Sequence, residues 1–185
     1  MRVIAAAYNY KGLEHSSGQP IVFFKTHKPE FVWENKENYI ILPKGANRVW
    51  AEVEYAFLIG EGRRIEGMGV ANDVTADWGA DCHYFFGKAM PSFCKISRPW
   101  SFRNPPWDNK MTMKINGSLH QEGYIRDMIV KPKALIERID RRVALEVGDI
   151  VLSGTPFHNK TPLKRGDIVE VEIQDIGKIT SKVRI

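Results

Sequence analysis

Short apolar runs separated by turn residues dominate the pattern of the chain. Residues 3–8, 20–25 and 39–42 are mostly apolar, β-branched or aromatic. Runs of this length, bounded by glycine and proline, are typical of β-strands. A further alternating run at residues 111–115 ends in an Asn-Gly pair, which favours a tight hairpin turn. The pattern predicts a protein built mainly from strands.

One segment shows helical periodicity instead. Leu135, Ile136, Ile139 and Val143 recur at the spacing that places side chains on one face of a helix. Pro132 lies just before them, and proline is favoured in the first turn of a helix. The spacing predicts a helix that begins at Pro132.

Two Gly-Asp pairs mark the start of further predicted strands. They lie at residues 148–149 and 166–167, and each is followed by Ile-Val. Residues 168–173 alternate apolar side chains with glutamate, so we expect one buried and one solvated face. Residues 77–107 are rich in Trp, Phe and Pro, and we expect an irregular stretch there. Together these elements predict a β-dominated α+β fold in a single domain, residues 1–185.

Two glutamates interrupt the longest of the apolar runs, at residues 50–60. On a strand, Glu52 and Glu54 point to the same face, at the edge of a core. A third carboxylate, Asp73, lies in the next strand-like stretch, residues 67–74. Three converging carboxylates fit a hard divalent cation. The alternative is that both glutamates are solvated on a sheet edge.

Composition and charge give little support to a nucleic-acid or membrane partner. The chain has 185 residues, of which 43% are hydrophobic and 26% charged, as in an ordinary globular domain. The formal net charge is +5, but the basic residues are scattered and not interleaved with stacking aromatic side chains. We therefore expect no nucleic-acid partner. No run is long and apolar enough to span a bilayer, so we expect no membrane partner either.

The expected location is the cytoplasm. The apolar run at the N-terminus is too short for a signal peptide and is predicted to form the first buried strand. Cys82 and Cys94 have neither metal nor redox spacing. Free thiols in a reducing compartment are therefore expected.

A series of motifs along nearly the whole chain resembles the fumarylacetoacetate hydrolase family. A single piece such as Gly-Thr-Pro is common, whereas the whole series in order is specific. The segments that carry the resemblance are, in order, Tyr8-Asn9-Tyr10, Pro20-Ile-Val-Phe-Phe-Lys25, Glu52-Val-Glu54-Tyr-Ala-Phe-Leu-Ile-Gly60, Gly69-Val-Ala-Asn-Asp73-Val-Thr-Ala76, Gly87-Lys88, Asn116-Gly-Ser-Leu-His-Gln121-Glu-Gly123, Gly148-Asp-Ile-Val-Leu-Ser-Gly-Thr-Pro156 and Arg165-Gly-Asp-Ile-Val.

The resemblance implies a mixed β-sheet roll with few helices, usually a homodimer. It implies that Glu52, Glu54 and Asp73 bind a metal ion, usually Mg²⁺ and sometimes Mn²⁺ or Ca²⁺. It also implies that Lys88 is an active-site residue and that Thr155 lies against the substrate. From spacing alone, an ordinary surface lysine beside a glycine turn is the favoured interpretation of Lys88, and Thr155 could simply shape the turn before Pro156. The implied substrates are small anionic 2-oxo or 2,4-dioxo acids or their enols.

Several positions depart from the family pattern. Many members carry a His and a Glu on a short lid, and the corresponding residues here are Leu13 and Ser16. His15 is the nearby candidate for a catalytic base. The usual substrate-binding Arg, four residues after the metal Asp, is Asp77. His158 follows the Gly-Thr-Pro motif where a small turn is usual, and it is either a pocket residue or part of a surface loop.

These residues predict a metal-dependent enzyme that acts through a stabilised enolate. One enolate serves isomerisation, decarboxylation and C–C bond hydrolysis, so the metal site does not choose among them. Loss of the lid pair favours the first two, which need no activated water. The alternative is a divergent member that binds a metal and an oxo acid without catalysis.

Overall fold

The computed structural model describes residues 1–13, 15, 17–25, 28–79, 86–98, 100, 108–156 and 160–185. Strands dominate these residues, as predicted. The strands are β1 (Val3–Ala7), β2 (Ile21–Phe24), β3 (Glu30–Trp33), β4 (Tyr39–Ile41), β5 (Arg48–Trp50), β6 (Val53–Ile59), β7 (Ile65–Asp73), β8 (Thr75–Asp77), β9 (Cys94–Arg98), β10 (Lys110–Ile115), β11 (Ser118–Tyr124), β12 (Ile150–Leu152), β13 (Ile168–Ile173) and β14 (Gly177–Arg184). The helical elements are α1 (Pro132–Val143) and the 3₁₀ turns η1 (Glu61–Arg63), η2 (Phe86–Lys88) and η3 (Ile125–Asp127).

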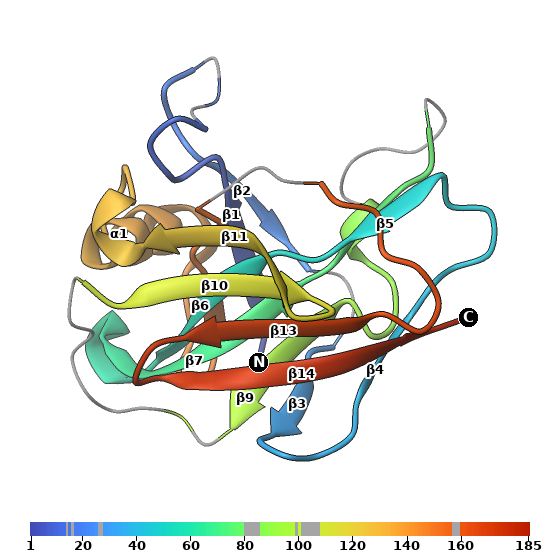
Figure 1. Cartoon of the computed structure of the whole chain (residues 1–185). Coiled ribbons are helices and arrows are strands. Elements are labelled where there is room, and N and C mark those ends of the chain that lie inside the picture. Colours follow the sequence, from blue (N-terminus) through green and yellow to red (C-terminus); the bar gives the residue numbers. More distant parts are fainter. Residues whose placement is uncertain are drawn as a thin grey trace.

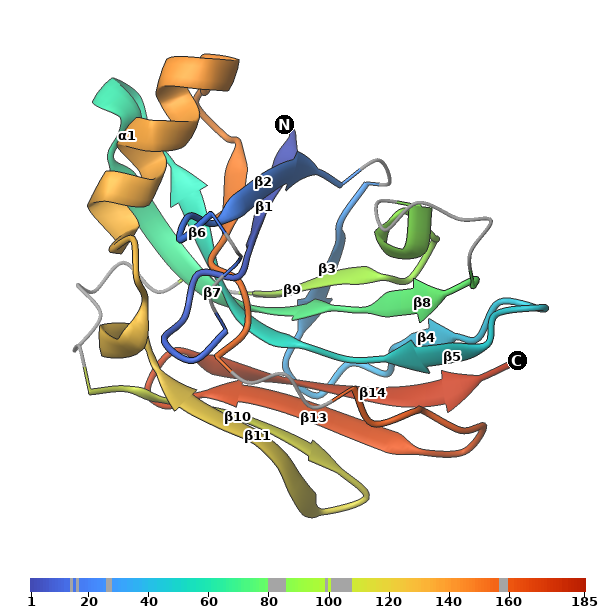
Figure 2. The same ribbon diagram turned by 90° about the horizontal axis from the view of Figure 1, so that it is seen from above.

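Two mixed sheets form the body of the molecule (Figures 1 and 2). The first has seven strands in the order β2-β1-β12-β6-β7-β9-β3, and the second has five in the order β11-β10-β13-β14-β4. A separate two-stranded ribbon pairs β5 with β8. Parallel pairs such as β1 with β12 lie beside antiparallel ones such as β6 with β7. The predicted β-dominated fold with few helices is confirmed.

The main core lies between the two sheets. Tyr55 and Phe57 of β6 contribute from the first sheet, and Met111 and Met113 of β10 contribute from the second. Ala56, which lies between these two residues of β6, points to the opposite face of the seven-stranded sheet, where a smaller apolar cluster forms. The carboxylates predicted to bind metal share this second face. The fold therefore keeps them away from the inter-sheet core.

The predicted helix forms and begins where expected. In α1 Pro132 occupies the first turn, and Leu135, Ile136 and Ile139 are buried in the main core. The helix lies beside η1 at one end of the sheets (Figure 2). It ends at Val143 and is capped by Ala144, which has a left-handed backbone conformation and donates its N–H to the carbonyl of Asp140. No helix in the described ranges is long and apolar enough to cross a membrane.

The prediction of an irregular stretch at residues 77–107 is wrong in part. Residues 94–98 form β9, which pairs with both β3 and β7 inside the larger sheet. The sequence pattern did not predict this strand because two of its buried residues are polar. Lys95 bonds to Glu30 at 2.5 Å, and the Ser97 hydroxyl accepts the backbone N–H of Val70 at 2.8 Å. Cys94 is buried here with a free thiol, and Cys82 lies outside the described residues.

Candidate metal centre

Three carboxylates meet at one end of the antiparallel pair β6–β7. Glu54 lies on β6 opposite Ala71, and Asp73 donates its backbone N–H to the carbonyl oxygen of Glu52 at 2.9 Å. Side chains two residues apart share a face, and Glu52 and Asp73 face each other across the pair. Carboxylate oxygens of all three residues lie within 4.8 Å of one another. The structure brings together the three residues predicted as metal ligands.

Burial makes this group of like charges costly. Glu52, Glu54 and Asp73 are 5%, 2% and 1% exposed. Burial, and then the negative charge of Asp73, hold the pKa of Glu54 well above its usual value. Burial also favours the neutral form of Asp73, but Lys25 and Lys88 outweigh it and hold the pKa of Asp73 below its usual value. The group therefore requires neighbouring cations.

Lys88 is the first of these cations and lies between two of the carboxylates. Its Nζ donates to Glu52 Oε2 at 2.7 Å and to Asp73 Oδ2 at 2.5 Å, and the residue is 2% exposed. Gly87 permits this approach, because a Cβ at Gly87 would stand 2.2 Å from the carbonyl oxygen of Ala76. These buried contacts do not fit an ordinary surface lysine. A catalytic role for Lys88 stays a prediction.

Lys25 is the second cation, and the sequence did not single it out. It follows β2, its side chain is fully buried, and its Nζ contacts Asp73 Oδ1. The same Nζ donates to the carbonyl oxygen of Phe93 at 3.2 Å. Its position at the end of an apolar strand could have identified Lys25 as a site residue, because a buried ammonium needs a charged or polar partner.

Side chains of the β5–β8 ribbon orient Glu52. Trp50 of β5 pairs with Thr75 of β8, and both side chains reach the same carboxylate. The indole Nε1 of Trp50 donates to Oε1 at 3.2 Å, and the Thr75 hydroxyl donates to Oε2 at 3.4 Å. Glu54 Oε2 accepts the backbone N–H of Gly154 at 2.8 Å. Both glutamates are therefore held before any ligand arrives.

The segment after β12 forms a wall of the site and carries Thr155. The Thr155 hydroxyl donates to Gln121 Oε1 at 3.3 Å. The same Gln121 oxygen accepts the N–H of Val53 at 3.1 Å, and the Gln121 amide donates to the carbonyl of Ala51 at 3.2 Å. Gln121, which had no assigned role, ties Thr155 to the strand that carries the glutamates.

A strained turn after β1 forms another part of the wall. Tyr8 has φ of 61°, in the left-handed region that non-glycine residues rarely adopt. The side chain of Asn9 fixes the turn, because it accepts the N–H of Val130 at 2.9 Å and donates to the carbonyl of Ser153 at 3.3 Å. Tyr8 lines the same cavity as Glu52 and Glu54.

A small cavity of about 20 Å³ lies at the carboxylates. This volume suits an ion or a single water, so a larger ligand must extend outward from it. The residues that line it are Ala6, Ala7, Tyr8, Leu13, Glu52, Glu54, Lys88 and Thr155.

His15, the candidate base, is not among the described residues that line this cavity. Its ring packs against Tyr8 with centroids 5.5 Å apart, and its Nδ1 lies 3.0 Å from the Ser17 hydroxyl. Leu13 lines the cavity at the position where the resemblance implies a histidine. Ser16 and His158 lie outside the described residues. Of the described residues that line the cavity, none is a histidine.

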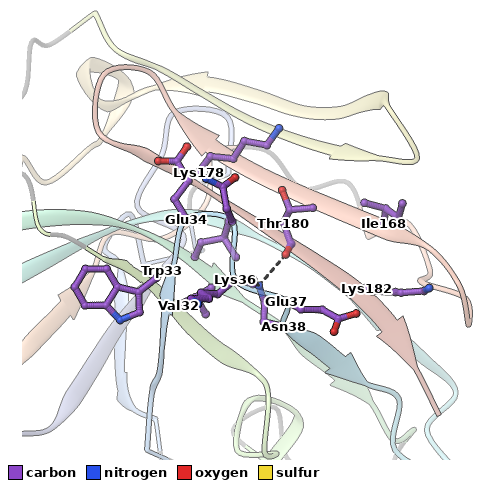
Figure 3. A pocket seen from close by; sticks show the side chains of 12 residues that line it. Val32, Trp33, Glu34, Lys36, Glu37, Asn38, Ile168, Lys178, Thr180 and Lys182 are labelled. Carbon is purple, nitrogen blue, oxygen red and sulfur yellow. Dashed lines mark hydrogen bonds between the residues drawn. The ribbon is translucent and has the colours of Figure 1, made fainter.

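A larger groove lies elsewhere and holds none of these groups. It has a volume of about 520 Å³ and runs between the β3–β4 connection and β14 (Figure 3). Its side chains include Glu34, Glu37, Lys178 and Lys182, and the Asn38 amide donates to the carbonyl of Thr180 across it at 2.7 Å. It contains no convergent carboxylates, so we place the chemistry at the smaller cavity.

The donor set fits a divalent cation. Carboxylate oxygens are the ligands that Mg²⁺, Mn²⁺ and Ca²⁺ prefer, and Glu52, Glu54 and Asp73 would hold the ion. Three carboxylates against two ammonium groups leave one formal negative charge, so a divalent ion would make the site positive and suited to an anion. Such an ion, when bound, polarises a carbonyl and stabilises an enolate.

Comparisons with known proteins identify the family of this chain. The family model described as fumarylacetoacetate (FAA) hydrolase C-terminal matches residues 2–184. Oxaloacetate tautomerase FAHD2B, mitochondrial, of Bos taurus is 34% identical over an alignment of 167 positions, gaps included, which covers 78% of this chain and 53% of that protein. This chain thus spans about half the length of that relative.

Solved structures show the same fold. The crystal structure of 5-carboxymethyl-2-hydroxymuconate delta-isomerase from Mycobacterium smegmatis has a TM-score of 0.84 and 26% identity, covering 98% of this chain and 78% of that one. Fumarylpyruvate hydrolase from Pseudomonas aeruginosa, solved with Mn²⁺ and pyruvate, has a TM-score of 0.87 over 100% of this chain and 90% of that one. Its identity of 19% supports the fold alone. The chain belongs to the fumarylacetoacetate hydrolase family.

Proposed function

We propose that this chain is a divalent-metal-dependent enzyme that interconverts the keto and enol forms of a small 2-oxo acid. The observation that carries the proposal is the buried group of Glu52, Glu54 and Asp73 with Lys88 bonded to two of its members. With a divalent ion bound, this site would be positive and would stabilise the enolate that forms when a proton leaves the carbon beside a carbonyl. A keto–enol shift requires no further intermediate.

The cavity wall favours isomerisation over C–C bond hydrolysis. Hydrolysis needs a base that activates water, and Leu13 cannot act as one. His15 is turned toward Ser17 and Tyr8 in this structure. Relatives named oxaloacetate tautomerase and delta-isomerase add support to this choice.

The residues have separate proposed roles. The Lys88 ammonium would bind the carboxylate or the developing oxyanion of the substrate, and Thr155 would lie against its carbon chain. His15 is proposed as the proton acceptor only if the turn that carries it rearranges, so a His15→Ala change should lower turnover less than a change at Lys88. Mg²⁺ is the proposed ion, with Mn²⁺ or Ca²⁺ as substitutes, and the proposed assembly is a homodimer.

The test is exchange of the C3 protons of oxaloacetate and 2-oxobutanoate in deuterated buffer, followed by NMR. We expect exchange that stops with EDTA and returns with Mg²⁺. Pyruvate formed from oxaloacetate would reveal decarboxylation, and cleavage of an acylpyruvate would reveal hydrolysis. Glu172→Gln, an exposed glutamate of β13, is the matched control for variants of the site. Metal binding without turnover of any substrate would instead establish the non-catalytic alternative.

A further inference from the structure

A second charged cluster continues outward from the metal centre along the β5–β8 ribbon, where the two strands lie side by side (Figure 2). Trp50 and Thr75, which both bond to Glu52, form one cross-strand pair. The outer pair on the same face is Arg48 with Asp77, because side chains two residues apart point the same way. The ribbon therefore leads directly from a metal ligand to an exposed ion pair.

This cluster carries more positive than negative charge. The Arg48 Nε donates to Asp77 Oδ2 at 3.1 Å, with 42% of the arginine side chain exposed. The Arg48 guanidinium carbon lies 5.3 Å from the centre of the Trp50 ring, and the Lys160 Nζ lies 5.2 Å from it. Two cations thus share one indole and one carboxylate.

Asp77 lies near both cations, but its single negative charge balances only one of them. An exposed Arg–Asp pair contributes little to stability and needs no second cation. Like charges brought to one indole repel unless an anion lies between them or solvent screens them. Arg48 bonds to Asp77 through Nε, so its terminal nitrogens are not used by that bond. The cluster has the donors that an incoming carboxylate requires.

We propose that Arg48 and Lys160 bind the distal carboxylate of a dicarboxylic 2-oxo acid. This inference rests on the proposed function, because the 2-oxo end of the same molecule would lie at the carboxylate group of Glu52, Glu54 and Asp73. The indole of Trp50 lies between the metal ligands and the two cations, since its Nε1 donates to Glu52 and both cations lie near its ring. Asp77 competes with the substrate for Arg48 and so tunes its affinity.

The test compares oxaloacetate with 2-oxobutanoate, which has a methyl group in place of the distal carboxylate. Both can be assayed by exchange at C3. For Arg48→Met and Lys160→Met we expect the KM for oxaloacetate to rise about tenfold, with kcat and the KM for 2-oxobutanoate nearly unchanged. Lys164→Met, an exposed lysine nearby in the chain, is the control and should change neither KM.

Asp77→Asn separates this proposal from a merely structural ion pair. If Asp77 competes with the substrate, its neutralisation should lower the KM for oxaloacetate by a few fold, opposite in sign to Arg48→Met. Equal losses for both substrates, or a loss in Asp77→Asn that matches Arg48→Met, would overturn the proposal.

A binding measurement covers the case of low turnover. Calorimetric titration with 2-oxoglutarate and 2-oxopentanoate, in the presence of Mg²⁺, reports the same distal group without catalysis. The proposal expects the parent protein to prefer 2-oxoglutarate and Arg48→Met to lose that preference. If the parent binds both ligands equally, the distal site does not exist, whereas failure of all metal-dependent exchange would count against the proposed function instead.

Discussion

Asp73 donates its backbone N–H to the carbonyl oxygen of Glu52 at 2.9 Å, so the two carboxylates bridged by Lys88 belong to directly facing residues of neighbouring strands. The backbone ladder thereby sets the separation of the carboxylates before any ion binds. Glu54 adds a third from two positions along the same face. A site built on paired strands is held more rigidly than one built on loops.

The buried charge of Glu54 should make the stability of the metal-free protein depend on pH. Burial and Asp73 raise the pKa of Glu54 in the folded protein. The metal-free protein should therefore lose stability as the pH rises from the pKa of Glu54 in the unfolded chain through its higher pKa in the folded state. Glu54→Gln removes that charge. We expect the metal-free variant to be more stable than the parent at pH 8, by on the order of 1–2 kcal/mol.

Denaturant unfolding in EDTA at pH 5 and pH 8 measures this effect. Adding Mg²⁺ should stabilise the parent and leave Glu54→Gln unchanged, because only the parent has the complete donor set. The control Glu172→Gln should behave as the parent. An identical pH dependence in the parent and Glu54→Gln would show that Glu54 does not carry this charge.

Lys25 should matter for both stability and activity. Lys25→Met leaves Asp73 with one cation in a buried position, and loss of one partner from a buried pair costs about 3–5 kcal/mol. We expect the metal-free variant to unfold at lower denaturant and Mg²⁺ to restore part of the loss. Lys28→Met, an exposed lysine three residues further along, is the control. Equal stability of the two variants would contradict the assignment of Lys25 to the site.

Gly87 should act through the position of Lys88. A Cβ in Gly87→Ala would lie 2.2 Å from the carbonyl oxygen of Ala76, so η2 must shift. We expect turnover to fall by about 10²-fold, because catalytic groups tolerate little displacement, while Mn²⁺ binding persists. Electron paramagnetic resonance of Mn²⁺ and the exchange assay measure the two effects. Loss of Mn²⁺ binding together with activity would mean that the change disrupts more than Lys88.

The pattern of the sequence predicted the elements whose burial follows a simple period. The helix at Pro132 and the strand at residues 168–173 are examples, since apolar side chains recur there at 3.6 and 2 positions. The spacing of Glu52 and Glu54 predicted that their side chains converge. These features depend on neighbouring residues alone.

Features that depend on distant partners were not predicted. Lys95 makes β9 look exposed, yet it is buried against Glu30, which lies 65 residues earlier in the chain. Lys25 meets Asp73 across 48 residues, so no local pattern shows the pair. Asp77 was interpreted as a lost cation, and only the cross-strand register shows that Arg48 faces it. In each case the partner is supplied by sheet topology.

Asp149 should make the fold sensitive to acid. Burial raises the pKa of Asp149, but hydrogen bonds from Arg2 and the backbone outweigh burial and lower it below its usual value. The stability that ionised Asp149 contributes is therefore present above the pKa of this residue in the unfolded chain. It is lost as the pH falls through its lower pKa in the folded protein. Asp149→Asn should cost about 2–3 kcal/mol at pH 7 and less near pH 3. Thermal or denaturant unfolding measures the difference, and a cost that does not shrink with acid would contradict this account.

The central claim is that a metal ion held by Glu52, Glu54 and Asp73 supports enolisation of a 2-oxo acid. The most direct measurement is C3 proton exchange of oxaloacetate by NMR, in one sample taken through EDTA treatment and then Mg²⁺ addition, with Asp73→Asn alongside. We predict that exchange in the parent falls to the rate of protein-free buffer and then rises above it again with Mg²⁺, whereas Asp73→Asn stays at the protein-free rate at both stages. Exchange that continues at full rate in EDTA, or in Asp73→Asn, would contradict the claim.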